Sequence, residues 1–127
     1  MMRQNEELEQ VAFIQWATLQ QGVYPELRWL FHIPNGGYRS KATAARLKAA
    51  GVKAGVPDLC LPVPKGTYHG LYIEMKYGKN KPTTTQKEWL EHLSGVGYCT
   101  AVCYSCEEAI AEIKKYITGG KTHEEKV

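Results

Sequence analysis

The sequence GVPDLCLPVPKGTYHGLYIEMKY, residues 55–77, consists of two apolar runs joined by a loop rich in proline and glycine. Two such runs around a short loop predict a pair of strands that form a hairpin, over 58–63 and 70–77. Because side chains alternate along a strand, Glu74 and Lys76 are expected on one face, about 7 Å apart along the backbone. Asp58 begins the first strand, where the hairpin can place it beside Glu74.

Outside this hairpin the chain alternates between helical and extended patterns. Apolar spacing, capping residues and glycine stops predict four helices, over 5–21, 40–51, 84–95 and 107–117. Short aromatic or branched runs predict two further strands, over 29–33 and 98–104, and the second is apolar enough to be buried. The order α-β-α-β-β-α-β-α predicts an α/β fold with a mixed four-stranded sheet and helices on both faces. No repeat or linker divides the sequence, so we expect one domain over 1–119 and a flexible tail over 120–127.

Two of these helices have an apolar side that is expected to face the core. In the first helix the side consists of Leu8, Val11, Ala12, Trp16 and Leu19. In the third helix it consists of Trp89, Leu90 and Leu93. Trp29 also lies in an apolar run, so all three tryptophans are expected in the core.

The formal net charge of +3 is a sum of two opposite regions. Residues 39–81 hold nine basic side chains against two acidic ones, a net charge of +7, and the rest holds seven against eleven, a net charge of −4. A basic segment of this kind predicts a polyanionic partner, with nucleic acid first. The two acids inside it, Asp58 and Glu74, therefore need a specific reason to be there.

The sequence argues against several classes of protein. No apolar run approaches the roughly 18 residues of a membrane span, and the polar start does not resemble a signal peptide. The length of 127 residues is enough for a core without disulfides. The four cysteines are therefore expected as reduced core thiols in a cytoplasmic protein, rather than as a zinc site around Cys103 and Cys106.

Asp58 and Glu74 predict a metal site. Two adjacent carboxylates repel each other unless a cation lies between them. Oxygen ligands suit Mg²⁺ or Mn²⁺ and argue against zinc. Such an ion polarises a phosphate and activates water, and Lys76 can orient that water or offset the charge that develops. The alternative is that Asp58 is a turn residue and that Glu74 and Lys76 form a solvated strand face.

Four motifs resemble one nuclease family. They are HIPNGG (32–37), GVPD (55–58), IEMK (73–76) and QKEWL (86–90). Together they resemble the stand-alone virus-type replication-repair nuclease (VRR-NUC) domain of the PD-(D/E)xK superfamily, over about residues 6–117. The resemblance implies a restriction-endonuclease-like core and a Mg²⁺-dependent endonuclease that hydrolyses phosphodiester bonds in DNA.

The resemblance also implies a biological setting. Small members of the family are similar to Holliday-junction resolvases, which implies branched DNA as the substrate, a homodimer, and a role in replication, recombination or repair. It implies a cytoplasmic protein of a bacterial host, phage or prophage, with no membrane partner and no small-molecule cofactor. The alternatives are a nuclease that prefers flaps, nicks or linear DNA, and a DNA-binding module of the same fold without catalysis.

Carried over to this chain, the family pattern implies a role for each matching residue. The metal ligands would be Asp58, Glu74, the carbonyl of Met75, and a first-helix glutamate. Glu6 fits that last role best, since it shares a helical face with Gln10, and Glu9 is the rival. The catalytic lysine and glutamine would be Lys76 and Gln86. For the early glutamates, the alternative is simple complementarity to the helix N-terminus.

Polar and basic residues near these motifs predict contacts to DNA. The segment from Asn35 to Lys41 combines glycines, amides and two cations just before a helix N-terminus, which favours phosphate binding. The expected DNA-binding residues are Asn35, Tyr38, Arg39, Lys41, Lys53, Lys79 and Lys81. The alternatives are an ordinary loop with a helix cap at Ser40, and a solvated turn around Lys79.

Overall fold

The computed structural model describes residues 4–34 and 40–119. Along the described residues, the elements follow the expected order with one 3-10 helix added: α1 (Gln4–Leu19), η1 (Pro25–Trp29), β1 (Phe31–His32), α2 (Lys41–Ala49), β2 (Leu59–Leu61), β3 (Leu71–Met75), α3 (Thr84–Gly95), β4 (Cys99–Cys103) and α4 (Cys106–Thr118). Three of the expected DNA-binding residues, Asn35, Tyr38 and Arg39, lie outside the described residues, as does the segment 120–127. None of the described helices has both the length and the apolar character that a membrane crossing requires.

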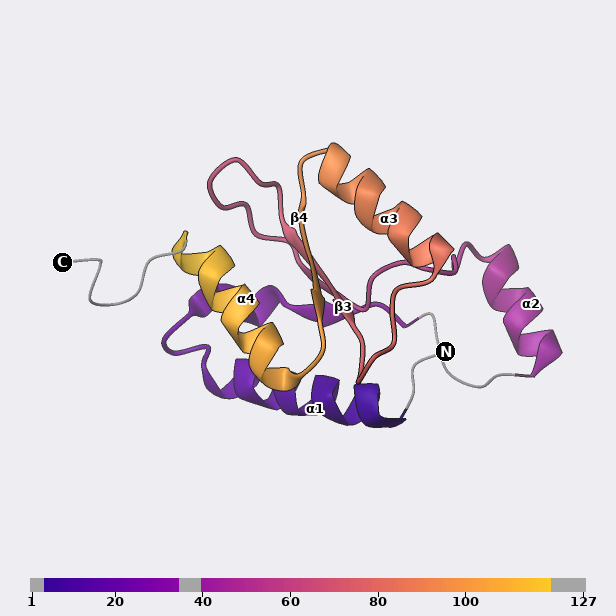
Figure 1. Cartoon of the computed structure of the whole chain (residues 1–127), viewed down its shortest axis with the longest axis horizontal. Helices are drawn as coiled ribbons and strands as arrows, with labels where there is room; N and C mark the ends of the chain where they lie inside the picture. The colour runs from indigo at the N-terminus through magenta and orange to yellow at the C-terminus, as the bar shows by residue number, and fades with distance from the viewer. Residues whose placement is uncertain (1–3, 35–39, 120–127) are drawn as a thin grey trace.

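The four strands form one mixed sheet in the order β1-β2-β3-β4, which confirms the predicted architecture (Figure 1). β2 pairs antiparallel with β1 and with β3, and β3 pairs parallel with β4. β2 and β3 are the predicted hairpin, and its register pairs Leu59 with Ile73. Extending this register by one residue sets Asp58 opposite Glu74, on the same face of the sheet.

The two faces of the sheet have different neighbours. Leu59, Ile73 and Met75 belong to the apolar core, together with Phe13 of α1 and Ile113 of α4. The residues between them in the strands, including Glu74, point to the opposite face. Helices α3 and α4 lie on opposite sides of β3 and β4 (Figure 1). The carboxylate pair therefore lies on the side of α3, away from the main core.

The predicted buried side of α1 is wrong for three of its five residues, whereas Trp16 is half-buried and packs against the core. Leu8, Val11 and Leu19 are 58%, 46% and 82% exposed. The buried side is instead formed by residues at spacings of four, three and four, namely Glu6, Gln10, Phe13 and Ala17. The periodicity is helical as expected, but the first turns bury polar groups, because this end of the helix lies near the carboxylate pair rather than over the apolar core.

Other expectations about burial also fail. On α3, Leu93 is buried but Trp89 and Leu90 are only half-buried. Trp29 belongs to η1, and its side chain is exposed. The last strand, β4, lies at the edge of the sheet, and only Cys103 among its five residues is buried. The apolar run therefore predicted the strand correctly but not its position at the edge of the sheet, which depends on how the other strands pair.

Helix α2 contributes no buried residue and stands apart from the body of the protein (Figure 1). Its start is fixed by Ser40, whose hydroxyl accepts a hydrogen bond from the Thr43 N–H, as the sequence predicts. Its end is a Schellman motif, in which the N–H groups of Gly51 and Val52 donate to the carbonyls of Lys48 and Leu47. This helix is therefore stabilised by local capping rather than by packing against the core.

A close backbone approach at Gly55 ties the segment before Asp58 to the start of α3. Gly55 has φ +87°, and a Cβ there would lie 2.6 Å from Cγ2 and 2.9 Å from the carbonyl carbon of Thr85. We expect Gly55→Ala to lower the free energy of unfolding by about 2–4 kcal/mol, measured by urea denaturation, because backbone strain and steric overlap add.

Gly66→Ala is the matched control for this prediction. Gly66 also has positive φ, +57°, but no atom lies within 4 Å of a Cβ placed there. Its substitution should cost only the conformational part, about 1–2 kcal/mol. Equal losses at the two positions would contradict the role assigned to the Gly55 contact.

Candidate active site

Asp58 and Glu74 form a buried carboxylate pair at the end of the hairpin. Their side chains are 8% and 2% exposed. Asp58 Oδ2 accepts a hydrogen bond of 2.7 Å from the Met75 N–H. The carbonyl of Asp58 accepts from the Ile33 N–H at 2.7 Å and from His32 Nδ1 at 2.8 Å. Asp58 is thus held by both neighbouring strands at the point where β2 begins.

The charged form of this carboxylate pair is electrostatically unfavourable. Burial raises the pKa of Asp58 above its usual range, although the Met75 N–H bond works in the other direction. Burial, followed by the charge of Asp58, raises the pKa of Glu74 to about 9, against the opposing effect of Lys76. Both shifts are in the direction expected of like charges forced into one buried site.

Gln86 and Lys76 complete the immediate surroundings of Glu74. Gln86 Nε2 donates to Glu74 Oε2 at 3.2 Å, while Gln86 Oε1 accepts from the Thr83 N–H at 2.9 Å and closes a capping box. One side chain therefore both starts α3 and holds the carboxylate. Lys76 is buried, and its N–H donates to the Cys103 carbonyl, which continues the pairing of β3 with β4.

The structure separates the two candidate glutamates of α1. Glu6 is buried, and its charge contributes to raising the pKa of both Asp58 and Glu74. Glu9 instead accepts a 2.8 Å hydrogen bond from the Cys106 N–H, at the N-terminus of α4. Glu6 thus lies near the carboxylate pair, and Glu9 caps another helix.

The donor atoms present fit a hard divalent cation. Glu74 Oε1 is buried and has no hydrogen-bond partner. The N–H and carbonyl of Met75 point to the same edge of β3, where the N–H meets Asp58. Within residues 4–34 and 40–119, no cluster of three or more His, Cys, Asp or Glu side chains is arranged to hold a metal. The oxygen donors at this point are two carboxylates and a carbonyl, a set that would suit Mg²⁺, which keeps several of its waters.

Gln10 is a further candidate for the site, to which the sequence analysis gave no role beyond sharing a helical face with Glu6. It lies one helical turn from Glu6 on the buried side of α1, and its Oε1 is buried without a hydrogen-bond partner. A buried, unsatisfied amide is costly to the folded state and is typical of functional sites. The available signal was the spacing of four residues between Glu6 and Gln10.

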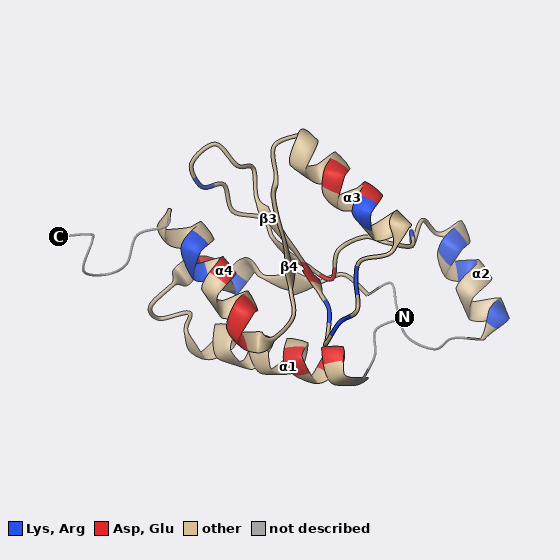
Figure 2. Cartoon of the chain, viewed as in Figure 1, with Lys and Arg blue, Asp and Glu red and all other residues tan. Residues whose placement is uncertain are grey.

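The expected DNA-binding lysines within the described residues are exposed. They are Lys41, Lys53, Lys79 and Lys81. Figure 2 shows basic residues without acidic ones on α2 and along the connection from β3 to α3, whereas α1 carries only acidic ones and α3 and α4 carry both. The excess of positive charge seen along the sequence is therefore found in space on α2 and on the connection that follows Glu74 and Lys76.

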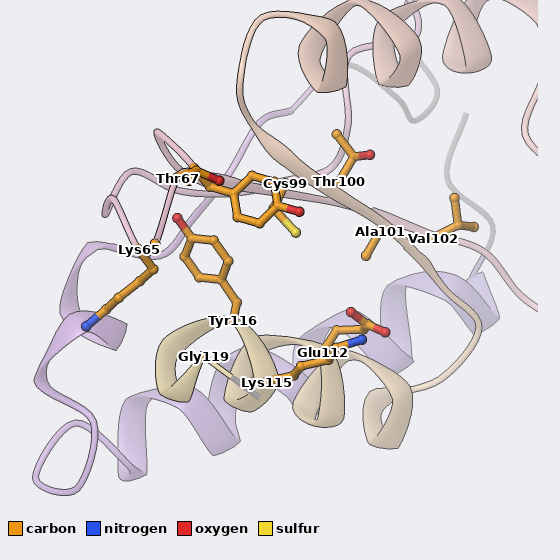
Figure 3. Close-up of a pocket in the computed structure, with 12 residues that line it drawn as sticks. Lys65, Thr67, Cys99, Thr100, Ala101, Val102, Glu112, Lys115, Tyr116 and Gly119 are labelled. Atoms are coloured by element: carbon orange, nitrogen blue, oxygen red, sulfur yellow. The ribbon is translucent and has the colours of Figure 1, made fainter. Parts of the chain in front are cut away.

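A pocket of about 640 Å³ lies elsewhere, between the hairpin loop, β4 and α4 (Figure 3). Its walls include Thr67 of the loop, Thr100 and Ala101 of β4, and Glu112 of α4. The loop precedes β3, whereas Glu74 is near the end of that strand. None of the residues that line this pocket belongs to the candidate active site.

Comparisons with known proteins agree with this architecture. A solved structure described as a "VRR_NUC domain protein" is 34% identical, with a TM-score of 0.79 over 95% of this chain and 94% of that one. A search of curated proteins found no match. A sequence model of the VRR-NUC domain matches residues 4–107, a span that contains the hairpin, Glu6 and Gln86. The chain therefore belongs to the VRR-NUC family of nuclease domains.

Proposed function

We propose that this chain is a Mg²⁺-dependent endonuclease that hydrolyses phosphodiester bonds in branched DNA such as Holliday junctions, with Mn²⁺ able to replace Mg²⁺. The observation that carries the proposal is the buried pair of Asp58 and Glu74, in which Glu74 Oε1 has no hydrogen-bond partner. A buried carboxylate pair in a basic surrounding is costly without a cation and useful with one.

The residues around the pair have distinct roles in this proposal. Asp58, Glu74 and the Met75 carbonyl would hold a divalent cation, which when bound would supply polarisation of a phosphate and activation of water. Lys76, on the same face as Glu74, offsets negative charge that develops on the phosphate during cleavage. Gln86 holds Glu74 Oε2 and thereby leaves Oε1 toward the site. Glu6 adds a further buried carboxylate beside them.

The basic surface beside the pair supports DNA as the substrate. Phosphates of the duplex would lie along the exposed lysines of the described residues, Lys41, Lys53, Lys79 and Lys81. Asn35, Tyr38 and Arg39 would contact phosphates or bases of the DNA. We also propose that residues 1–119 form one domain and that the protein is a homodimer, which would match the two-fold symmetry of a four-way junction. It would act in the cytoplasm of a bacterial or phage-infected cell.

The test compares a labelled four-way junction with flap, nicked and linear duplexes of the same sequence, in Mg²⁺, Mn²⁺ or EDTA, on a denaturing gel. We expect cleavage of the junction with either metal, none in EDTA, and at least about tenfold slower cleavage of the linear duplex, which is about 1.4 kcal/mol in the barrier. Equal cleavage of all substrates would contradict the branched-DNA preference. No cleavage of any substrate would favour a non-catalytic DNA-binding module.

A further inference from the structure

A groove of about 610 Å³ lies between α2 and the first turns of α3. Its floor is apolar and includes Leu47, Val52 and Trp89, and Lys48 and Lys53 lie along it. Glu88, the acid next to Trp89 in sequence, lines an adjoining pocket with His92 and Trp89 itself, and does not line this groove. The groove therefore combines an aromatic and aliphatic floor with positive charge.

The groove is built by specific local contacts. The Schellman motif brings Val52 back to Leu47, with a 3.0 Å hydrogen bond from the Val52 N–H to the Leu47 carbonyl. Trp89 Nε1 donates to the Ala54 carbonyl at 3.1 Å, which holds the indole ring against the segment before Asp58. Because α2 buries no residue in the core, its position and its basic side chains are not explained by stability.

The groove and the candidate active site draw on neighbouring residues of the same two segments of the chain. Thr85 lines the groove, and the next residue, Gln86, donates to Glu74 Oε2. Lys53 and Ala54, which also line the groove, precede Asp58 by only a few residues. In a DNA strand cut at the carboxylate pair, the nucleotides next to the cleavage position would therefore pass this groove.

The charge and the floor together indicate what the groove binds. Residues 40–57 contain Lys41, Arg46, Lys48 and Lys53 and no acid, which favours an anion. Contacts to the phosphates of a duplex need cations but no apolar floor. An aromatic ring with adjacent cations is typical of sites for unpaired nucleotides, whose bases stack on the ring while their phosphates meet the cations.

We propose that this groove binds an unpaired nucleotide of the DNA substrate, with its base against Trp89 and Leu47 and its phosphate at Lys48 and Lys53. The inference rests on the proposed function in taking DNA as the ligand. It assigns the recognition of branched or single-stranded character to a surface separate from the metal ligands.

The test measures binding in EDTA by fluorescence anisotropy, with a blunt 12-base-pair duplex and the same duplex carrying a five-thymidine single-stranded extension. The wild-type protein is expected to bind the extended duplex at least about fivefold more tightly. Trp89→Leu should remove this difference. Lys48→Ala, at an exposed position on α2, should reduce the preference for the extended duplex about threefold or more.

Arg46→Ala is the matched control, because it removes the same charge from the same helix at a position that does not line the groove. It should weaken binding to both probes equally. Equal wild-type affinity for the two probes, or the same effect of Lys48→Ala and Arg46→Ala on their ratio, would overturn the proposal. Since binding is measured without metal, preference for the extension without any cleavage in Mg²⁺ would support the groove and contradict the nuclease. Cleavage without that preference would overturn the groove alone.

Discussion

Glu74→Gln is expected to lower the rate of DNA cleavage by about 10²- to 10³-fold, a loss of several kcal/mol of transition-state stabilisation, and to raise the melting temperature of the metal-free protein. The activity falls because the amide cannot supply an anionic oxygen for the cation. The stability rises because Glu74 is 2% exposed and faces Asp58, and burial with that charge raises its pKa to about 9. A neutral amide of the same shape removes that electrostatic cost.

These opposite effects make the experiment specific. Single-turnover cleavage of the preferred DNA gives the rate, and a thermal melt in EDTA gives the stability. Glu88→Gln, at an exposed position on α3, is the control and should change neither. A Glu74→Gln protein that loses both activity and stability would mean that the carboxylate has a structural role. A protein that keeps its activity would remove Glu74 from the proposed mechanism.

The second large effect concerns pH and metal together. In EDTA, the melting temperature of the wild-type protein should fall as the pH rises from 6 to 9. Glu74 has an ordinary pKa of 4.5 and a folded-state pKa of about 9, so the folded protein binds more protons than the unfolded chain in this interval. Stability is therefore lost as pH rises toward the folded-state value, which is the reverse of the usual behaviour of a salt-bridged carboxylate.

Mg²⁺ should abolish this dependence. The ion competes with the proton on Glu74, so its affinity should rise by up to about tenfold per pH unit between pH 6 and 9. At about 100 times its dissociation constant it should stabilise the fold by about 2.7 kcal/mol, or several degrees in the melt. Glu74→Gln is the control and should show neither the pH slope nor the metal shift. A flat wild-type profile in EDTA, with no shift on adding Mg²⁺, would contradict a metal site at this pair.

Part of the site followed directly from the sequence. A hairpin has local pairing, so two apolar runs around a Pro/Gly loop were enough to place Asp58 beside Glu74 and to put Lys76 on the same face. Helix caps are equally local, and Ser40 begins α2 as expected. The role of Gln86 as a cap and as a partner of Glu74 combines a local signal with a tertiary one.

Other features could not be derived in this way. The hydrophobic pattern of α1 pointed to Leu8 and Leu19, which are exposed, and away from Glu6 and Gln10, which are buried. Sequence patterns assume that buried means apolar, and this assumption fails where a helix end lies beside a polar site. The edge position of β4 could not be predicted either, because an apolar strand can have the same composition at an edge as at the centre of a sheet.

The sequence by itself determined the order of the elements, the hairpin, and the identity of the carboxylate pair, because these depend on residues close along the chain. Only the tertiary structure decided that Glu6 lies near this pair while Glu9 caps α4, that Gln10 is buried without a partner, and that α2 and Trp89 form a groove next to Gln86. The physical reason is that these arrangements depend on how distant helices pack around the end of the sheet. Packing follows total shape and polarity, which short sequence patterns do not contain.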